Sequence, residues 1–129
     1  MRIRHVTSAD LPAVYALLIS NGWQHRVRNL AMLSELVAAS PIAEVAIVDE
    51  RVVGFCRGLS DGLSNGYLSM VVVDEAYRTR GIGRRLLERA IGTNPEITWV
   101  VRAGREGADA FFSRLGFTAS TIAMERKRS

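Results

Sequence analysis

The chain has 129 residues, of which 48% are hydrophobic and 23% are charged, and it carries a formal net charge of +4. This length corresponds to one domain over residues 1–129, and this composition is sufficient for a buried core. No apolar run approaches membrane-spanning length and no apolar signal region follows Met1, so we expect a cytoplasmic protein with no membrane partner. The positive charge is modest and lacks a basic stripe with interleaved aromatic residues, which argues against nucleic acid as a partner.

The cysteine and histidine content argues against two further classes of protein. Cys56 is the single cysteine, so the chain has no internal disulfide, and its apolar surroundings favour a small buried hydrophobe over a nucleophile. His5 and His25 lie far apart in the sequence and offer no metal-ligand spacing. We therefore expect neither a disulfide framework nor a metal site.

Apolar periodicity predicts a strand and two helices before residue 40. Residues 2–6 alternate as in a short strand. A helix capped by Ser8 or Asp10 is predicted up to about residue 20, where Asn21-Gly22 ends it. A second amphipathic helix is predicted over 27–39.

The rest of the chain is predicted to alternate between strands and helices. The predicted elements are a hairpin of strands at 43–48 and 52–59, a strand at 68–73, a helix at 82–91, a strand at 97–102, a helix at 106–114 and a last strand at 117–125. Only the helix at 82–91 has the spacing of a parallel crossover. The order β-α-α-β-β-β-α-β-α-β therefore predicts an α/β fold, with a central, mixed and twisted sheet and helices on both faces.

The stretch from Tyr67 to Gly92 combines a strand, an arginine- and glycine-rich turn and a helix. A helix N-terminus presents unpaired N–H groups and a partial positive charge, and both favour bound anions. Gly81 and Gly83 remove Cβ atoms that would keep a phosphate from the backbone. Planar donors suited to phosphate oxygens come from four arginines around the turn, Arg78, Arg80, Arg84 and Arg85. The stretch predicts a pyrophosphate site, and the alternative is a basic turn that only caps a surface helix.

Two other glycine-rich phosphate loops fit this turn less well. A P-loop ends in Gly-Lys-Ser/Thr, whereas Gly83 is followed by Arg84-Arg85. A dinucleotide fingerprint needs a third glycine three residues after the second, and that position is Leu86. Neither class of nucleotide site is predicted.

What the turn does match is Arg-x-x-Gly-x-Gly after an apolar strand, from Arg78 to Gly83. It resembles the acetyl-CoA signature of the GCN5-related N-acetyltransferases, or GNAT family. Residues 110–117, Ala-Phe-Phe-Ser-Arg-Leu-Gly-Phe, are similar to the fourth-helix segment of the same family. The element order resembles the acyl-CoA N-acyltransferase fold over essentially the whole chain.

The resemblance implies direct transfer of an acetyl group from acetyl-CoA to a primary amine of a small molecule or peptide. N–H groups from Arg80 to Arg85 would hold the pyrophosphate. The edge of the strand over Val71, Val72 and Val73 would pair with the pantetheine arm, in a gap where strands 68–73 and 97–102 splay apart. The backbone N–H of Val72 or Val73 would polarise the thioester carbonyl. The cofactor residues so implied are Val71, Val72, Val73, Arg78, Arg80, Gly81, Ile82, Gly83, Arg84 and Arg85.

The chain departs from the family at the positions that transfer protons. Tyr67 stands where many members have Glu, Phe112 stands where the usual acid is Tyr, and Arg105 replaces an Asn that often contacts the cofactor. Tyr67 is therefore a candidate proton relay or substrate contact, with half-buried packing in the sheet as the alternative. Ser69, two residues further along the same strand face, is a second candidate that could hold a relay water.

The connection between the first two predicted helices commonly borders the acceptor site in this family. His25 in it titrates near neutrality, and Trp23 could face a substrate cation or simply pack beneath the loop. Asp61, in the loop before the signature strand, is a further candidate partner for an amine, although loop acids are usually only solvated.

Two other functions remain open on the sequence. The missing Glu and Tyr fit a non-catalytic acyl-CoA-binding module, and the arginines from Arg78 to Arg85 with the basic tail fit, less well, a nucleic-acid-binding domain. The resemblance also suggests a homodimer, and the identity of the amine is not determined.

Overall fold

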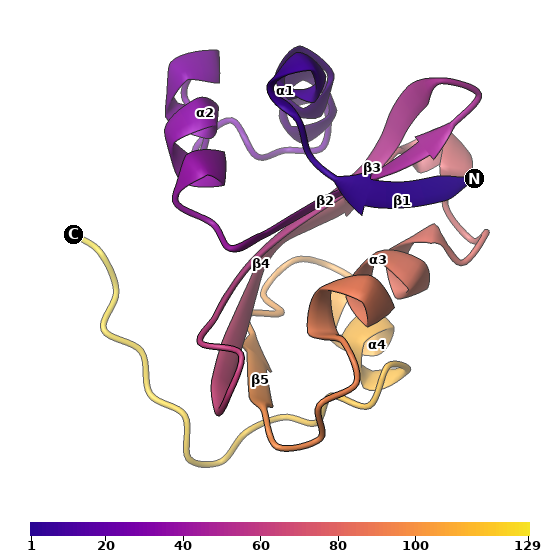
Figure 1. Cartoon of the computed structure of the whole chain (residues 1–129). Coiled ribbons are helices and arrows are strands. Elements are labelled where there is room, and N and C mark those ends of the chain that lie inside the picture. Colours follow the sequence, from indigo (N-terminus) through magenta and orange to yellow (C-terminus); the bar gives the residue numbers. More distant parts are fainter.

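The computed structural model describes all residues 1–129 and contains one sheet with the strand order β1-β2-β3-β4-β5 (Figure 1). Helices and short 3₁₀ turns at Ser8–Asp10 and Glu75–Tyr77 connect the strands. The elements are β1 (Arg2–His5), α1 (Leu11–Ser20), α2 (Leu30–Ala38), β2 (Ile42–Val48), β3 (Arg51–Ser60), β4 (Asn65–Val73), α3 (Ile82–Ile91), β5 (Thr98–Val101) and α4 (Ala108–Ser113). None of the helices is long and apolar enough to cross a membrane.

The sheet is mixed, as predicted. Strands β1 to β4 pair antiparallel, whereas β5 pairs parallel to β4 after the crossover through α3. The β2–β3 hairpin turns at Asp49 and Glu50, which have φ of 49° and 63°. Two successive left-handed residues match the twist of the flanking strands, so this tight turn forms without glycine.

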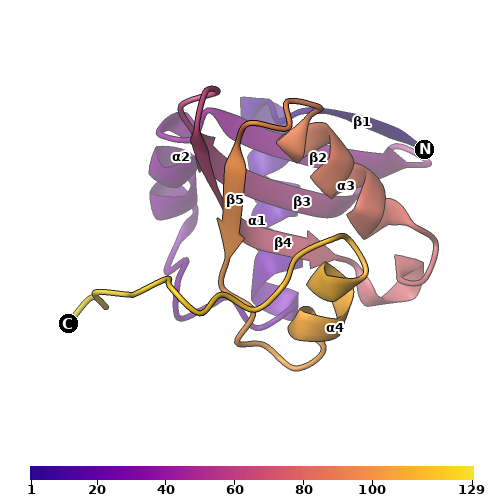
Figure 2. The same ribbon diagram turned by 90° about the horizontal axis from the view of Figure 1, so that it is seen from below.

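Helices cover both faces of the sheet, which confirms the predicted layering. Figure 1 shows α1 and α2 above the sheet, and Figure 2 shows α3 and α4 on the opposite face. Each face has its own core, the first centred on Phe55 with Leu18 and Leu33, the second on Leu86 and Leu87. Burial of each such side chain contributes about 1.5–3 kcal/mol, so both helix layers are held mainly by apolar contact.

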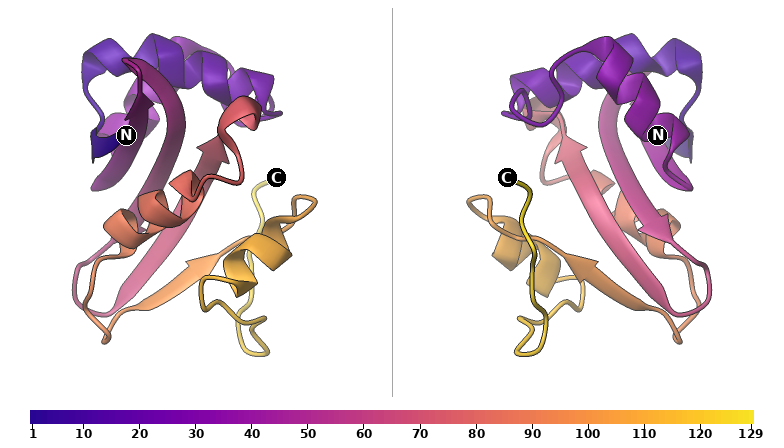
Figure 3. Two further views of the ribbon diagram at one scale, coloured as in Figure 1. Left: turned by 90° about the vertical axis from the view of Figure 1, so that its right-hand side faces the viewer. Right: turned by 90° about the vertical axis from the view of Figure 1, so that its left-hand side faces the viewer.

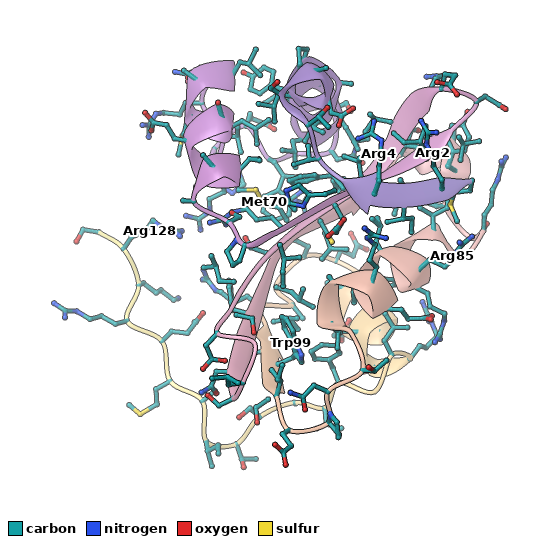
Figure 4. All side chains as sticks on the ribbon, viewed as in Figure 1. Arg2, Arg4, Met70, Arg85, Trp99 and Arg128 are labelled. Carbon is teal, nitrogen blue, oxygen red and sulfur yellow. The ribbon has the colours of Figure 1, made fainter.

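A β-bulge interrupts β4 at Met70. Val72 pairs with Phe55 and Ser69 with Arg57, so β4 has one more residue than β3 between these two pairs. Met70 has φ of 56° and packs into the core beneath α1 and α2 (Figure 4). A bulge bends a strand and increases its twist, and here it lies just before the segment 71–73.

β4 and β5 part soon after they pair. Their parallel pairing joins Asn65–Leu68 to Thr98–Val101 and ends there. Figure 3 shows the two strands diverging beyond this short ladder, with α1 and α4 on opposite sides of the opening. The outer edge of β4 from Ser69 to Val73 is therefore not covered by β5, in agreement with the splay that the family resemblance implies.

The predicted last strand over 117–125 is wrong. The chain has no regular secondary structure after Ser113, and Ile122 and Met124 are 89% and 96% exposed. Local alternation of apolar and polar residues favoured a strand there, but a strand also needs a partner edge and a buried face. Only an ion pair between Arg102 and Glu125, at 2.5 Å, holds the distal part of the tail. The helices predicted at 27–39 and 106–114 are shorter in the structure, whereas the helix predicted at 82–91 has the predicted bounds. Helix α2 begins after Asn29, whose side chain accepts a hydrogen bond from the Met32 N–H.

A close contact between α3 and α4 accounts for Gly83. A Cβ built at Gly83 would lie 3.0 Å from Cζ of Phe111 and 3.6 Å from a methyl group of Val73. The absent side chain thus makes room for the Phe111 ring over the first turn of α3. The sequence explains Gly83 by the need for a phosphate to approach the backbone. The contact with Phe111 is a second reason why this position has no side chain.

The N-terminus of α1 is tied to β1 through Asp10. Its carboxylate accepts hydrogen bonds from the Arg4 guanidinium at 2.7 and 2.9 Å and from the Thr7 N–H at 2.7 Å. These hydrogen bonds, that from Arg4 foremost, hold the pKa of Asp10 well below its usual range. Asp10 therefore joins the first strand to the first helix and does not act as a simple helix cap.

Replacing Asp10 by Ala should lower the free energy of unfolding at pH 7 by about 2 kcal/mol, because the Arg4 and Thr7 donors lose their acceptor. An aspartate with a lowered folded-state pKa contributes stability above its unfolded-state pKa of about 3.9 and loses it as pH falls through the folded value. In urea unfolding, the difference between the free energies of unfolding of the wild type and Asp10→Ala should therefore become smaller below pH 4. Glu96→Ala, which removes an exposed carboxylate without an ion pair, is the control. An equal difference in free energy of unfolding at pH 2 and pH 7 would contradict the stabilising role of the ionised Asp10.

Gly83→Ala should destabilise the protein by about 1 kcal/mol, because the added methyl group overpacks against Phe111. In a Phe111→Ala background the same change should stabilise by up to about 1 kcal/mol, since alanine is the better helix former. The double-mutant cycle by thermal or urea unfolding measures this reversal. Gly104→Ala, whose Cβ would meet nothing within 4 Å, is the matched control. Equal effects of Gly83→Ala in both backgrounds would show that the ring does not restrict this position.

Candidate functional site

A groove of about 610 Å³ lies where β4 separates from β5. Its walls come from four parts of the chain: the end of β4, the turn and first residues of α3, the loop after α1, and the segment around α4. The lining residues are Asn21, Trp23, Val71, Val72, Val73, Tyr77, Arg78, Thr79, Gly81, Ile82, Gly83, Arg84, Arg105, Glu106, Gly107, Ala108, Phe111, Phe112, Arg114 and Leu115. The fold therefore brings together nearly all the residues that the sequence implied for the cofactor.

The first turn of α3 opens into this groove. Gly81 is the residue before the helix, with φ of 80°, and no side chain caps the N–H groups that follow. A Cβ at Gly81 would meet nothing within 4 Å, so the approach to the backbone is open there. The N–H groups of Ile82, Gly83 and Arg84 precede the first bond of the helix ladder and are free for an anion.

One part of the predicted phosphate site is corrected by the structure. The Arg85 N–H donates to the Gly81 carbonyl at 3.1 Å, as the first bond of the ladder, and so is not available to a ligand. The exposed Arg85 side chain is also absent from the groove lining. The sequence pattern placed Arg84 and Arg85 side by side, but successive residues of a helix point about 100° apart.

Arg78 holds the frame of the groove together. Its Nε donates to the Val73 carbonyl at 3.0 Å and its Nη2 donates to Oδ1 of Asn21 at 2.5 Å. These bonds join the end of β4 to the loop after α1, which lies far away in the sequence. Arg78 therefore fixes the separation of two walls as well as supplying positive charge.

The other two arginines of the turn, Arg84 and Arg80, differ in whether they line the groove. Arg84 lines the groove and donates through Nη2 to the Arg114 carbonyl at 3.2 Å, which joins α3 to the end of α4. Arg80 lies outside the lining, with its guanidinium 5.0 Å from the ring centroid of Tyr77. Arg84 is thus the exposed arginine of α3 placed to meet an anion bound at the helix N-terminus.

The far end of the groove is bordered by the loop after α1. The Arg105 guanidinium stacks 4.6 Å from the ring centroid of Trp23, and its Nη2 donates to the Asn21 carbonyl. The sequence left open whether Trp23 faces a substrate cation or packs beneath the loop. In the structure the protein's own Arg105 stacks on the ring. Residues Asn21, Tyr77 and Phe111 of the lining were not predicted as site residues, since no local pattern relates these three segments.

The candidate proton-transfer residues do not meet in the groove. Tyr67 and Ser69 lie on the face of β4 that points towards α1 and α2, and neither lines the groove. Phe112 lines it but is buried in the second core, and His25 is an exposed residue of the loop after α1. Tyr77 and Thr79 supply the hydroxyl groups of the lining, and Glu106 its one carboxylate.

The structure assigns Asp61 a local role. Its carboxylate accepts hydrogen bonds from the N–H groups of Leu63, Ser64 and Asn65 and from the Ser64 hydroxyl. These bonds, led by those from Ser64, lower the pKa of Asp61. The carboxylate therefore organises the β3–β4 turn, and its use as a partner for an amine is not supported. No group of three or more metal-ligating side chains lies together in the chain.

Residues 41–119 match the family model of an acetyltransferase (GNAT) domain. The PanD regulatory factor of Salmonella typhimurium is 34% identical over 84 residues, which cover 61% of this chain and 65% of that protein, just under two thirds of its length. The peptidyl-lysine N-acetyltransferase YjaB of Escherichia coli is 24% identical over 121 residues, which cover 90% of this chain and 79% of that one.

The fold agrees with solved structures. A GNAT family acetyltransferase from Streptococcus pneumoniae superposes with a TM-score of 0.70 at 23% identity, over 98% of this chain and 97% of that one. At this identity the likeness concerns the fold alone. The family model covers more than half of the chain and both regions that carry the sequence resemblance. The chain belongs to the GNAT acetyltransferase family.

Proposed function

We propose that this chain is an acetyl-CoA-dependent N-acetyltransferase that acts directly on a primary amine. The observation that carries the proposal is the continuity of one groove from a free helix N-terminus to the unpaired edge of β4. An anion-binding end and an extended backbone edge suit a cofactor with a pyrophosphate and a long amide-containing arm.

The residues of the groove fit the two halves of acetyl-CoA. The pyrophosphate would be held by the N–H groups of Ile82, Gly83 and Arg84, with the Arg84 side chain beside it. The arm would follow Val71–Val73, against the apolar side chains of Phe111 and Leu115. When bound, acetyl-CoA supplies the acetyl group as a thioester.

Residues of this chain would stabilise the reacting carbonyl group and transfer the proton of the amine. A backbone N–H at Val72 or Val73 would stabilise the negative charge that develops on the carbonyl oxygen, and loss of one such donor typically costs about 3 kcal/mol. The amine has a pKa near 10 in water and must lose a proton before attack. Tyr67 and Ser69, on the sheet face opposite α3, are the groups we assign to contact the amine and relay this proton. Phe112 supplies no hydroxyl to protonate the departing thiolate, so solvent entering the groove would do so.

A second function is favoured by one comparison. PanD regulatory factors match this chain, and their name denotes regulation of another protein. A non-catalytic acyl-CoA-binding regulator would use the same groove and would not need the absent hydroxyl at Phe112. The two functions predict the same cofactor binding and differ only in turnover and in a protein partner.

Isothermal calorimetry with acetyl-CoA tests the shared part of both functions. We expect the wild type to bind and Arg84→Gln to bind about tenfold or more weakly, because a charge-assisted hydrogen bond contributes about 1.5–3 kcal/mol. Arg85→Gln is the matched control, since it removes the same charge from the neighbouring residue outside the groove, and should change affinity less than about threefold. A folded wild type that does not bind acetyl-CoA would overturn the assignment of the groove.

Turnover then separates the enzyme from the regulator. Release of coenzyme A should rise when a primary amine is added to the wild type and acetyl-CoA, and the acetylated amine should appear in equal amount. Tyr67→Phe should lower kcat by about tenfold or more if its hydroxyl relays the proton. Acetyl-CoA binding without transfer to any amine or lysine peptide would favour the regulator.

A further inference from the structure

The sheet face opposite α3 carries an arginine at the point where β4 and β5 part. Arg57 of β3 pairs with Ser69 of β4, and the next level of the sheet aligns Leu59, Tyr67 and Val100 across three strands. Because paired residues point to the same face, Arg57 and Ser69 share a face with Tyr67. Arg57 therefore lies beside the groups that we assign to the amine.

Arg57 is held in place but has no counter-ion. Its Nε donates to the Ser40 hydroxyl at 2.6 Å, and that hydroxyl donates to the Leu36 carbonyl at 2.5 Å. Neither Nη atom of Arg57 has a hydrogen-bond acceptor in the protein, and none of the ion pairs includes this residue. The side chain is partly buried, and this burial lowers the pKa of Arg57.

The terminal nitrogens of Arg57 are not enclosed by the protein, so a ligand can reach them. Taking a charge partly out of water costs free energy that an ion pair normally offsets. Ser40 fixes one edge of the Arg57 side chain, so the two terminal nitrogens are oriented before any ligand arrives. A planar pair of donors matches the two oxygens of a carboxylate.

The surroundings of this face reinforce the charge. A second cavity, of about 390 Å³, is lined by Arg26, Arg102, Glu125, Arg126, Lys127 and Arg128. Glu125 is the one acid among them and is already paired with Arg102. Arg128, the residue before the last, lies on the side of the molecule where α2 lies (Figure 4). An acceptor reaching the sheet from this side meets an excess of positive charge, which attracts anions.

We propose that the amine acceptor carries a carboxylate near its amine and that Arg57 binds this carboxylate. The inference rests on the proposed function, because it concerns the acceptor of the same acetyl transfer. Two sources share this chemistry: a free amino acid, and a peptide with an acidic residue next to its lysine. Ser69 and Tyr67 would face the amine while Arg57 holds the anion.

Matched pairs of amines test the inference in both binding and turnover. The free amino-acid pair is L-alanine with L-alaninamide. The peptide pair has blocked ends and one lysine flanked by Glu or by Gln. In each pair, the anionic member is the one that carries the carboxylate, and the neutral member carries an amide in its place. Binding is followed by NMR titration of the protein with and without coenzyme A, and turnover by release of coenzyme A from acetyl-CoA. We expect the anionic member of at least one pair to bind, and to react with a kcat/KM, about tenfold or more better than its neutral counterpart.

Variants then assign the preference to Arg57. Arg57→Gln should raise KM for the anionic amine about tenfold or more, leave kcat within about threefold, and abolish the preference over the neutral amine. Arg57→Lys should restore part of it, since it returns the charge without the planar fork. Arg51→Gln removes the same charge from the exposed start of the same strand and should change nothing. Ser40→Ala removes the contact to Nε only and should weaken the preference less than Arg57→Gln does.

The outcomes separate this inference from the function on which it rests. A wild type that acetylates neutral and anionic amines equally, or keeps its preference in Arg57→Gln, would overturn the inference and leave the acetyltransferase intact. A wild type that binds no acetyl-CoA would overturn the proposed function, and the NMR titration would still decide whether Arg57 binds the anionic probe. Failure of every probe to bind would also overturn the inference. Preference for the amino acid or for the acidic peptide identifies the source of the carboxylate.

Discussion

The separation of β4 from β5 is the constraint on which the rest of the site depends. A parallel ladder limited to Asn65–Leu68 and Thr98–Val101 leaves the distal edge of β4 without a strand partner. Unpaired backbone groups on a strand edge are a liability unless they are covered or used. In this protein they form one wall of a groove that ends at the N-terminus of α3, so the break in the sheet and the free helix end act together.

The arginines around the turn combine structural and electrostatic roles. Arg78 joins the end of β4 to the loop after α1, and Arg84 joins α3 to the residue that ends α4. Arg105 stacks on Trp23 and bonds to the same loop. Three cations therefore hold the groove open at a fixed width while their charge favours a polyanionic cofactor. Such pre-organisation lowers the free-energy cost of binding, because the donors are in place beforehand.

The two faces of the sheet divide the two substrates of the proposed reaction. The groove that suits the acetyl donor lies between β4, α3 and α4, whereas Arg57, Tyr67 and Ser69 face α1 and α2. A donor and an acceptor on opposite faces can meet only at the gap between β4 and β5. This arrangement fits direct transfer in a ternary complex.

Local patterns predicted most of the fold and the strand, turn and helix that line one side of the groove. The strand, glycine turn and helix from Leu68 to Ile91 were predicted because their signals lie within one stretch of chain. The predicted last strand does not form, because no strand edge is available to pair with residues 117–125. The Arg85 N–H does not contribute to the anion site, because it makes the first hydrogen bond of α3. The bulge at Met70 gave no signal at all, since its left-handed conformation depends on how β3 and β4 register against each other.

By itself the sequence determined the GNAT family, the mixed sheet with helices on both faces, and a helix that begins at a glycine-rich turn after β4. Each of these follows from residues that are neighbours along the chain. Only the tertiary structure decided that Asn21, Tyr77 and Phe111 join the groove, that Arg105 stacks on Trp23, and that Arg57 lies unpaired beside Tyr67. These relations join segments from distant parts of the sequence. They are set by the packing of two helix layers on a sheet that opens between β4 and β5, which no local pattern encodes.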